Sequence, residues 1–325
     1  MNEPKAPRGN SLDQPRYQPL PEVLLCADIG GTRARLIVAD LNQRIIARKV
    51  IPSEGLTVER LASELASFGS DGKVRAACVG LAGVISGDER TLSVAPNLSS
   101  IEGIPLKPLL QERLGVPVAV ENDVNLAALG EHASGAGVGT DSMVLISLGT
   151  GLGAGIIING KLIRGARDGA GEIGFLSSVE DIERQSTNVG SLEAKVSGAA
   201  LERYGNPREI FERARAGEKA ARRIVGSVAD GLGVAVANVF ALLDPQQVVL
   251  GGWITREQDL LFDHVCRVAA QLAPGSAPVL LAELGDDATL LGAASVAHQL
   301  ANGSLRSSSK GTQLAGSSSA SDDKL

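Results

Sequence analysis

Two glycine-rich turns, each preceded by a run of apolar residues, constrain the fold of this chain more than any other feature. The first is Asp28-Ile-Gly-Gly-Thr32 after residues 24–27, and the second is Gly149-Thr-Gly-Leu-Gly153 after residues 143–148. A strand that ends in glycines lets backbone N–H groups approach a phosphate, because no Cβ stands in the way. One such turn is a weak signal, but two indicate a duplicated fold that holds one polyphosphate from both sides. The repeat therefore points towards phosphoryl transfer.

Composition is that of a soluble globular protein and excludes several classes of partner. The chain has 325 residues, of which 44% are hydrophobic and 21% are charged, and this length suits two domains or one large one. Its formal net charge is −6 with no basic block, and only 2% of residues are aromatic, so we expect no nucleic-acid partner. No apolar run reaches membrane-spanning length, and residues 1–21 lack the apolar core of a signal peptide. We therefore expect a cytoplasmic protein with no membrane partner.

The cysteines and histidines favour neither disulfides nor a metal cage. Cys26, Cys78 and Cys266 are widely spaced in apolar stretches, which is typical of buried thiols in a reducing compartment. The three histidines are isolated from one another, and no CxxC or HxxH pair is present.

The ends of the chain differ in composition from its body. Residues 1–22 are polar and proline-rich and predict a disordered N-terminal arm, and residues 303–325 are a low-complexity tail that we also expect to be disordered. Between them strands alternate with helices, which predicts an α/β fold. We expect a small N-terminal α/β domain over residues 23–128, completed by a closing helix at 288–302. A large C-terminal α/β domain is expected over residues 129–287.

Hydrophobic periodicity and turn residues predict the individual elements. Strands are expected at residues 24–27, 34–40, 44–51, 74–80, 116–121, 143–148, 154–158, 161–163, 247–250 and 279–284. Helices are expected at residues 58–68, 106–114, 124–133 and 288–300, and helices are expected to dominate residues 191–243, the last of them at 232–243. The helix at 232–243 is apolar nearly all round, which predicts that it is buried. Asn159-Gly160 predicts a hairpin turn, and Asp123 is a candidate N-cap for the helix that follows it.

More strand follows each glycine turn, and this limits the phosphate-binding arrangements. The first glycines lie at a hairpin bend, where the amides of Gly30, Gly31 and Thr32 can surround phosphate oxygens. Asp28, at the end of the strand, can hold a Mg²⁺. A plain hairpin turn is the alternative. The second turn matches the dinucleotide pattern G-x-G-x-x-G/A, but that pattern needs a helix next, whereas a β-branched run follows here.

Seven short motifs follow one another along residues 23–301, nearly the whole body of the chain. They are Asp28-Ile-Gly-Gly-Thr32, Glu121-Asn-Asp-Val-Asn125, Leu148-Gly-Thr-Gly-Leu-Gly-Ala-Gly-Ile156, Gly169-Ala-Gly-Glu-Ile-Gly174, Asp244-Pro, Gly251-Gly252 and Gly285-Asp-Asp-Ala-Thr-Leu-Leu-Gly-Ala293. In this order they resemble the ROK family of bacterial sugar kinases. The resemblance implies an actin-like (ribonuclease H-like) ATPase fold, with a duplicated β-sheet core and an active site in the cleft between two domains. It also implies ATP-dependent phosphorylation of a hexose hydroxyl, usually at C6, and homodimers are frequent in the family.

The resemblance also gives roles to individual residues. Asp123 is expected to be the general base that accepts the proton of the sugar hydroxyl. The residues expected in the hexose pocket are Gly83, Asn97, Asn122, Glu172 and Glu193. The residues expected at ATP are Gly30, Gly31, Thr32, Gly149, Thr150 and Gly151, with Asp28 near the Mg²⁺ and Gly251 and Gly252 against the adenosine.

One loop departs from the family pattern. After Glu-x-Gly the family has a histidine and then a zinc-binding C-x-C-G-x-x-G-C-x-E loop. This chain has Phe175 at the histidine and Arg184, Ser186 and Ser191 at the three cysteines, although Glu193 at the end of the loop is present. A tetrahedral zinc site cannot form without its ligands, so no structural zinc is expected. The departure concerns the hexose pocket and leaves the phosphate and base residues in place.

Taken together, the residues and the resemblance predict an ATP:hexose phosphotransferase that acts on glucose or a related sugar and uses ATP and Mg²⁺. A sugar-sensing binding protein of the same fold is one alternative. The missing histidine and zinc ligands favour it, whereas the retained Asp123, Glu172 and Glu193 disfavour it. A dinucleotide-dependent enzyme that uses residues 149–154 is a second alternative.

Overall fold

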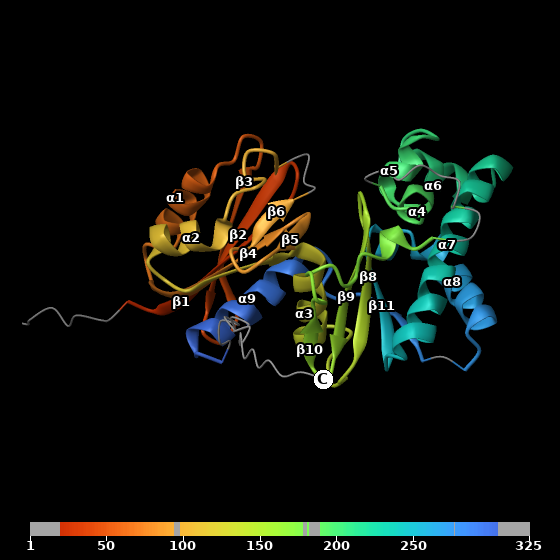
Figure 1. Cartoon of the computed structure of the whole chain (residues 1–325). Coiled ribbons are helices and arrows are strands. Elements are labelled where there is room, and N and C mark those ends of the chain that lie inside the picture. Colours follow the sequence, from red (N-terminus) through yellow and green to blue (C-terminus); the bar gives the residue numbers. More distant parts are fainter. Residues whose placement is uncertain (1–19, 94–97, 178–180, 182–188, 276, 305–325) are drawn as a thin grey trace, which may run out of the picture.

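The chain folds into two α/β halves with a pair of helices between them (Figure 1). The computed structural model describes residues 20–93, 98–177, 181, 189–275 and 277–304. Almost all of the predicted N-terminal arm and C-terminal tail therefore lies outside the described residues, and so do Asn97, Arg184 and Ser186.

Each half contains a five-stranded sheet, and the two sheets have the same strand order. The first sheet runs β3 (Ile45–Pro52), β2 (Arg33–Asp40), β1 (Glu22–Ile29), β4 (Lys73–Leu81), β7 (Val118–Asn122). The second runs β10 (Lys161–Ile163), β9 (Leu152–Ile158), β8 (Met143–Leu148), β11 (Gln247–Gly252), β12 (Val279–Leu281). In both, the first three strands are antiparallel to their neighbours among them, and the third, fourth and fifth strands are parallel to one another. The prediction of a duplicated sheet core is confirmed.

The central strands are buried on both faces, which explains their continuous apolar sequences. Along β1, Leu25, Ala27 and Ile29 point into one hydrophobic cluster, and Leu24 and Cys26 point into another. This alternation is the two-residue period of a strand with a core on each side.

Helices cover both faces of each sheet. On the first sheet, α1 (Val58–Phe68) and α2 (Leu106–Leu114) share one cluster with the strands, and α9 (Ala288–Ala301) packs against the opposite face. On the second sheet, α7 (Lys219–Leu243) and α8 (Gln258–Leu272) cover one face, and α3 (Asp123–Ser134) contacts the other. The short helices α4 (Glu193–Val196), α5 (Gly198–Glu202) and α6 (Pro207–Arg215) lie beside α7 (Figure 1).

The helices α3 and α9 cross between the two sheets, and their backbones touch. A Cβ on Gly130 would lie 2.1 Å from the carbonyl oxygen of Ala288, and one on Gly292 would lie 1.8 Å from that of Leu126. No other residue fits at either position without a shift of the backbone. The predicted limit between residues 128 and 129 falls inside α3, so this helix belongs to both halves. The domain limits themselves remain a proposal.

Most predicted elements are found, with differences that have local causes. The helices at 58–68 and 106–114 and the strands at 143–148 and 161–163 have the predicted ends. Asn159 and Gly160 form the predicted turn with φ of 53° and 67°. The helices α4 to α7 fall within the mainly helical region expected over 191–243, whereas α8 and the short hairpin β5 (Val84–Ser86) and β6 (Thr91–Ser93) are not among the expected elements.

Two predictions about helices are wrong in detail. Asn122, not Asp123, is the N-cap of α3, since its side chain accepts hydrogen bonds from the amides of Val124 and Asn125. The segment 232–243 is not buried all round, because Leu242 at the end of α7 is 75% exposed. The whole of α7 is long and apolar enough to cross a membrane, which the sequence analysis did not anticipate. It forms the core of the second half instead.

Candidate active site

The two glycine turns have the same internal hydrogen bond. In the first, the Gly30 amide donates to the carbonyl oxygen of Arg33 at 3.0 Å, and in the second the Gly149 amide donates to that of Gly151 at 2.9 Å. The two amides after each of these, Gly31 and Thr32 in one turn and Thr150 and Gly151 in the other, have no acceptor among the described residues. The amide of Gly30, expected at a phosphate, is thus already used within its turn. Each turn still offers two adjacent N–H groups.

Other parts of the second half surround its glycine turn. The Gly149 carbonyl oxygen accepts from the amide of Gly198, which begins α5, and from the indole Nε1 of Trp253, both at 3.0 Å. Gly251 and Gly252 pair in register with Ser147 and Leu148 on the neighbouring strand. The predicted nucleotide residues of this half therefore lie together where β8 and β11 end. Trp253, which follows Gly252 in the chain, holds the glycine turn through its hydrogen bond to Gly149.

Asp28 ends β1 and is 7% exposed. Arg35, its cross-strand partner in β2, binds Oδ2 of Asp28 through both Nε, at 3.0 Å, and Nη2. The same guanidinium donates to the backbone oxygen of Asp286 at 2.6 Å, in the turn η5 (Gly285–Asp287) that leads into α9. Arg35 thus fixes Asp28 relative to α9. Among the described residues Oδ1 of Asp28 has no partner, so one carboxylate oxygen is available for a cation.

The corner between β7 and α3 carries Asn122 and Asp123. The Oδ1 atom of Asn122 accepts from the amides of Val124 at 2.9 Å and Asn125 at 3.0 Å, and its Nδ2 donates to the carbonyl oxygen of Gly83 at 3.0 Å. Asp123, at intermediate exposure, accepts one hydrogen bond at Oδ1 from the amide of Val124 at 2.9 Å. Its other carboxylate oxygen has no partner within the described part of the chain. The corner therefore holds Asp123 by its backbone and leaves its carboxylate largely free.

Carboxylates from both halves act on one another at this corner. Burial, and then the charges of Asp28 and Glu172, together raise the pKa of Asp123 to about 7 against the opposing effect of the backbone hydrogen bonds. Burial, and then the charge of Glu193, raises the pKa of Glu172 above its ordinary value. Asp28 and Glu172 thus act on Asp123, and Glu193 acts on Glu172, although the four residues come from distant sequence positions. A carboxylate with a pKa near 7 suits general acid–base work at neutral pH.

Glu193, at the start of α4, lies against the second glycine turn. Its Oε2 atom accepts from the amide of Leu152 at 2.8 Å, and a Cβ on Gly151 would lie 2.8 Å from the same oxygen. This carboxylate therefore connects the predicted hexose pocket with the predicted phosphate turn. The absence of a side chain at Gly151 is what makes room for it.

The loop that differs from the family pattern is described only in part. Phe175 is 55% exposed in the short turn η2 (Ile173–Phe175) that follows Glu172, and Ser191 precedes α4. Within the residues that the structure describes, no group of three or more His, Cys, Asp and Glu side chains is arranged to hold a metal ion.

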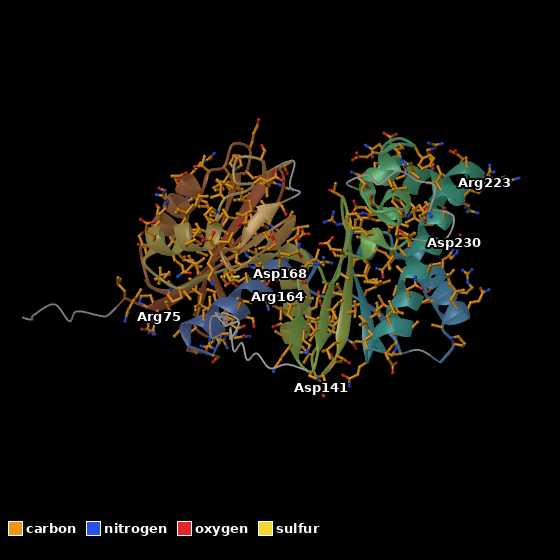
Figure 2. All side chains as sticks on the ribbon, in the orientation of Figure 1. Arg75, Asp141, Arg164, Asp168, Arg223 and Asp230 are labelled. Carbon is orange, nitrogen blue, oxygen red and sulfur yellow. The ribbon has the colours of Figure 1, made fainter. Side chains whose placement is uncertain are left out.

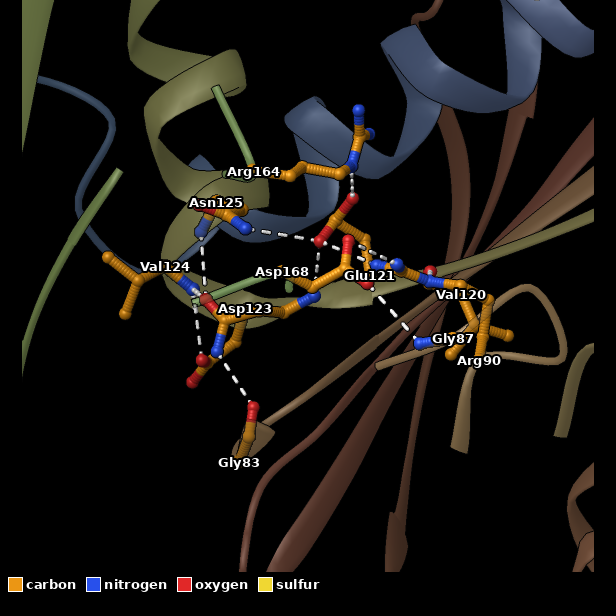
Figure 3. Close-up of polar contacts among 11 residues, drawn as sticks. Gly83, Gly87, Arg90, Val120, Glu121, Asp123, Val124, Asn125, Arg164 and Asp168 are labelled. Atoms are coloured by element: carbon orange, nitrogen blue, oxygen red, sulfur yellow. Dashed lines mark hydrogen bonds and ion pairs between the residues drawn. The ribbon is translucent and has the colours of Figure 1, made fainter. Parts of the chain in front are cut away.

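Glu121, Arg90, Arg164 and Asp168 form a polar network behind Asp123 that the sequence analysis did not identify (Figure 3). Glu121 is 3% exposed and accepts from Arg90 at 3.1 Å and from Arg164 at 2.6 Å. Arg90 also pairs with Asp168 at 3.0 Å. The sequence signal for this network is Glu121 itself, a carboxylate at the end of the apolar strand 116–121, because a buried carboxylate needs partners. Figure 2 places Arg164 and Asp168 between the two halves.

The structure brings together most of the predicted site residues. Gly83 and Asn122 are joined by a hydrogen bond at the corner that carries Asp123, and Gly149 to Gly151 lie beside Glu193, Gly251 and Gly252. A cavity of about 620 Å³ lies elsewhere, between residues 42–45, the end of α3 and α9, and none of the predicted site residues lines it. The strand β9 follows the second turn, so the dinucleotide interpretation, which needs a helix there, is wrong.

Comparison with known proteins gives one consistent result. The sequence model described as "ROK family" matches residues 24–300. A glucokinase of Streptomyces coelicolor is 32% identical over 307 residues, which cover 84% of this chain and 96% of the relative. Among solved structures, the ROK family glucokinase of Streptomyces griseus in complex with glucose and AMPPNP has a TM-score of 0.70 at 32% identity, covering 85% of this chain and 99% of that one. The ROK hexokinase of Thermus thermophilus has a TM-score of 0.74 at 30% identity, covering 85% and 98%.

Proposed function

This chain belongs to the ROK family of sugar kinases, and on that premise we propose that it transfers the γ-phosphoryl group of ATP to a hexose hydroxyl, with Asp123 as general base. The observation that carries the proposal is the state of Asp123: a carboxylate with one free oxygen and a pKa of about 7, placed at a rigid corner among carboxylates of both halves. The substrate that we favour is glucose or a closely related sugar, phosphorylated at C6.

In the proposed reaction the sugar oxygen attacks the γ-phosphorus as Asp123 takes the hydroxyl proton. A bond forms between that oxygen and phosphorus, and the bond to the β,γ-bridging oxygen breaks with its electron pair going to ADP. Positioning and charge neutralisation supply most of the catalysis in such reactions. The buried Asp28, held by Arg35, keeps a free oxygen with which it would hold the Mg²⁺ of Mg-ATP, and that ion supplies positive charge at the phosphates.

The paired amides of the two glycine turns support the nucleotide part of the proposal. Gly31 and Thr32 in one half and Thr150 and Gly151 in the other each present adjacent N–H groups of the kind that bind phosphate oxygens. Gly251 and Gly252, next to the second turn, would lie against the adenosine.

The carboxylates and the corner support a hexose as acceptor. Glu172 and Glu193 offer acceptors for sugar hydroxyls, and Asn122, whose Oδ1 is used by the helix cap, retains one Nδ2 hydrogen for a sugar oxygen. Gly83 accepts a hydrogen bond from Asn122 through its carbonyl oxygen, and Asn97, which lies outside the described residues, is proposed as a further contact of the sugar. Water exclusion on closure of the two halves would prevent ATP hydrolysis. We propose a cytoplasmic enzyme that works on small molecules rather than nucleic acid or membranes, as a homodimer.

The test is ADP release from Mg-ATP in the presence of single hexoses: glucose, mannose, fructose and N-acetylmannosamine. We expect release that depends on the sugar and is largest for glucose. Binding of a hexose without any ADP release would instead support the sugar-sensing protein, which the phenylalanine at position 175 favours. Absence of both binding and turnover with every sugar would contradict the proposal.

A further inference from the structure

The polar network next to Asp123 joins the two halves of the molecule. It contains both ion pairs that the described residues form between the segment from β5 to β7 and the loop after β10. Arg164 and Asp168 belong to the loop of residues 164–172, which ends at Glu172. Arg164 Nε lies 2.6 Å from Oε2 of Glu121, and Arg90 Nη1 lies 3.0 Å from Oδ1 of Asp168. The backbone amide of Gly87 also donates to Oδ2 of Asp168 at 3.3 Å. Three contacts thus join two segments that are far apart in the sequence.

Glu121 connects this network directly to the corner that carries the base. Its Oε1 atom accepts from the backbone amide of Asn122 at 3.0 Å and from Nδ2 of Asn125 at 3.1 Å. These two donors flank Asp123 in the chain. Any displacement of the Glu121 carboxylate must therefore move the first turn of α3 or break two hydrogen bonds in it.

Two residues of the network, Arg90 and Asp168, have an unusual backbone conformation. Arg90 and Asp168 have φ of 56° and 58°, a left-handed region that side chains other than glycine rarely occupy. Such conformations persist where surrounding contacts determine them, and they concentrate at functional sites. Arg90 is held by three partners, namely Glu121, Asp168 and the carbonyl oxygen of Val120 at 2.9 Å. Its guanidinium is 13% exposed and Glu121 is 3% exposed, so these pairs are shielded from water.

We propose that Arg90, Glu121, Arg164 and Asp168 form a positioning latch that holds the Glu172 loop against the Asp123 corner and thereby sets both hexose affinity and alignment of the base. The proposal rests on the function proposed above. The latch residues are positioning residues, since they act through Asp123 and Glu172. The two glycine turns lie outside the latch, so ATP binding does not depend on it.

The test compares two latch variants with a control from the same loop. Asp168→Gly removes the carboxylate while giving residue 168 the amino acid best suited to its backbone, so folding is retained. Arg164→Met removes the contact with Glu121 from a side chain that is 39% exposed. The control is Arg167→Met, because Arg167 is exposed and has no partner among the described residues. Asp168→Asn keeps an acceptor for Gly87 and tolerates a positive φ, and serves as a partial rescue.

We expect the two latch variants to raise the KM for hexose and to lower kcat, each roughly tenfold, because small misplacements of reacting groups are costly. The KM for ATP should stay within about twofold of the wild type, because the two glycine turns lie outside the latch. Asp168→Asn should recover part of the loss, and Arg167→Met should behave like the wild type.

A second measurement separates the latch from the catalytic proposal. Hexose binding is measured by calorimetry without nucleotide, and ATP binding by the fluorescence of Trp253, the single tryptophan of the chain, whose indole contacts the second glycine turn. If the wild type binds a hexose but transfers no phosphate, weaker hexose binding in the latch variants still supports the latch while the kinase proposal fails. Equal effects on hexose and ATP, or no difference from Arg167→Met, would overturn the latch. So would a wild type that binds no hexose.

Discussion

The two glycine turns are built alike but are placed in different surroundings. Each follows a buried strand, each closes with a hydrogen bond from its first glycine, and each leaves the next two amides without an acceptor among the described residues. Beside the first turn Asp28 pairs with Arg35, and the carbonyl oxygen of Thr32 accepts from the amide of Ser53 at 3.3 Å. Around the second lie Glu193, the first residue of α5, and Trp253.

The difference shows how a repeated sheet acquires two roles. The strand order supplies the same pair of amides twice, which suits a ligand that carries phosphates along its length. The residues around each turn then differ: a charged pair on the strands themselves, Asp28 and Arg35, in the first half, and the Glu193 carboxylate and the Trp253 indole in the second. The repeat thus provides the frame, and the neighbouring side chains distinguish the two turns.

The largest expected effect belongs to Asp123, the proposed base. Asp123→Asn should lower kcat by roughly 10²–10⁴, because the amide cannot accept the hydroxyl proton. Steady-state ADP release measures it, and the fluorescence of Trp253 should show nucleotide binding unchanged. The matched control is Asp141→Asn, an exposed aspartate at the far end of the second sheet (Figure 2). Near-normal turnover of Asp123→Asn would remove this residue from the base role.

The contact between the halves is the next test, and it concerns stability rather than chemistry. Gly130→Ala places a methyl group 2.1 Å from the Ala288 carbonyl oxygen and should reduce the free energy of unfolding by about 1–3 kcal/mol. Urea unfolding gives the value. Gly169→Ala, where a Cβ meets nothing within 4 Å, is the control and should unfold like the wild type. Equal stability of both variants would show that the α3–α9 contact is looser than described.

The pH dependence of kcat tests whether carboxylates of both halves act on one base. Asp123 accepts a proton only when ionised, so kcat should fall as the pH decreases through its pKa of about 7 and reach roughly one tenth of the plateau one unit below it. Since the charge of Glu172 raises this pKa, Glu172→Gln should move the fall in kcat to lower pH. If kcat at saturating substrate falls at the same pH in the wild type and in Glu172→Gln, the charge of Glu172 does not act on Asp123.

The smallest expected effect compares alanine in the two turns. Gly151→Ala forces the Glu193 carboxylate away from the Leu152 amide, with a cost of about 1 kcal/mol, or a factor of about five in the KM for hexose. Gly30→Ala meets only the Arg33 carbonyl oxygen at 3.3 Å and should leave the hexose KM unchanged. Initial rates over a range of hexose concentrations distinguish the two. Similar values for both variants would mean that Glu193 is not tied to the second turn.

Much of the fold and part of the site could be predicted from sequence because they depend on local patterns. Strand periodicity located both hairpins, and the motif order points to Asp28, Asp123 and Glu193 as the proposed site residues. The contact between Asp28 and Arg35 was within reach as well, since a hairpin closing between Ile29 and Ala34 must place these two residues opposite each other. The helix α8 was also within reach, since the spacing of Leu261, Val265 and Ala269 is that of an amphipathic helix.

The latch could not be predicted in the same way. Arg90 and Asp168 are 78 residues apart, and each has a backbone conformation that its own sequence does not favour. Their meeting depends on how the two sheets are placed by α3 and α9, which no local pattern specifies. The N-cap at Asn122 was missed for a simpler reason, because both Asn122 and Asp123 are good caps and only the strand end decides between them.

The position of α9 has a consequence for how the protein is made. One face of the first sheet is covered by α1 and α2, which precede the second half in the chain, but the other face receives Leu290, Ala293 and Ala294 from α9, which follows it. Before α9 is synthesised, the only helix that can cover Leu24, Cys26 and Ile37 within this cluster of described residues is α3, through Leu126. The first half can therefore complete this core only after the second half has been translated, and apolar surface left uncovered in the meantime favours aggregation.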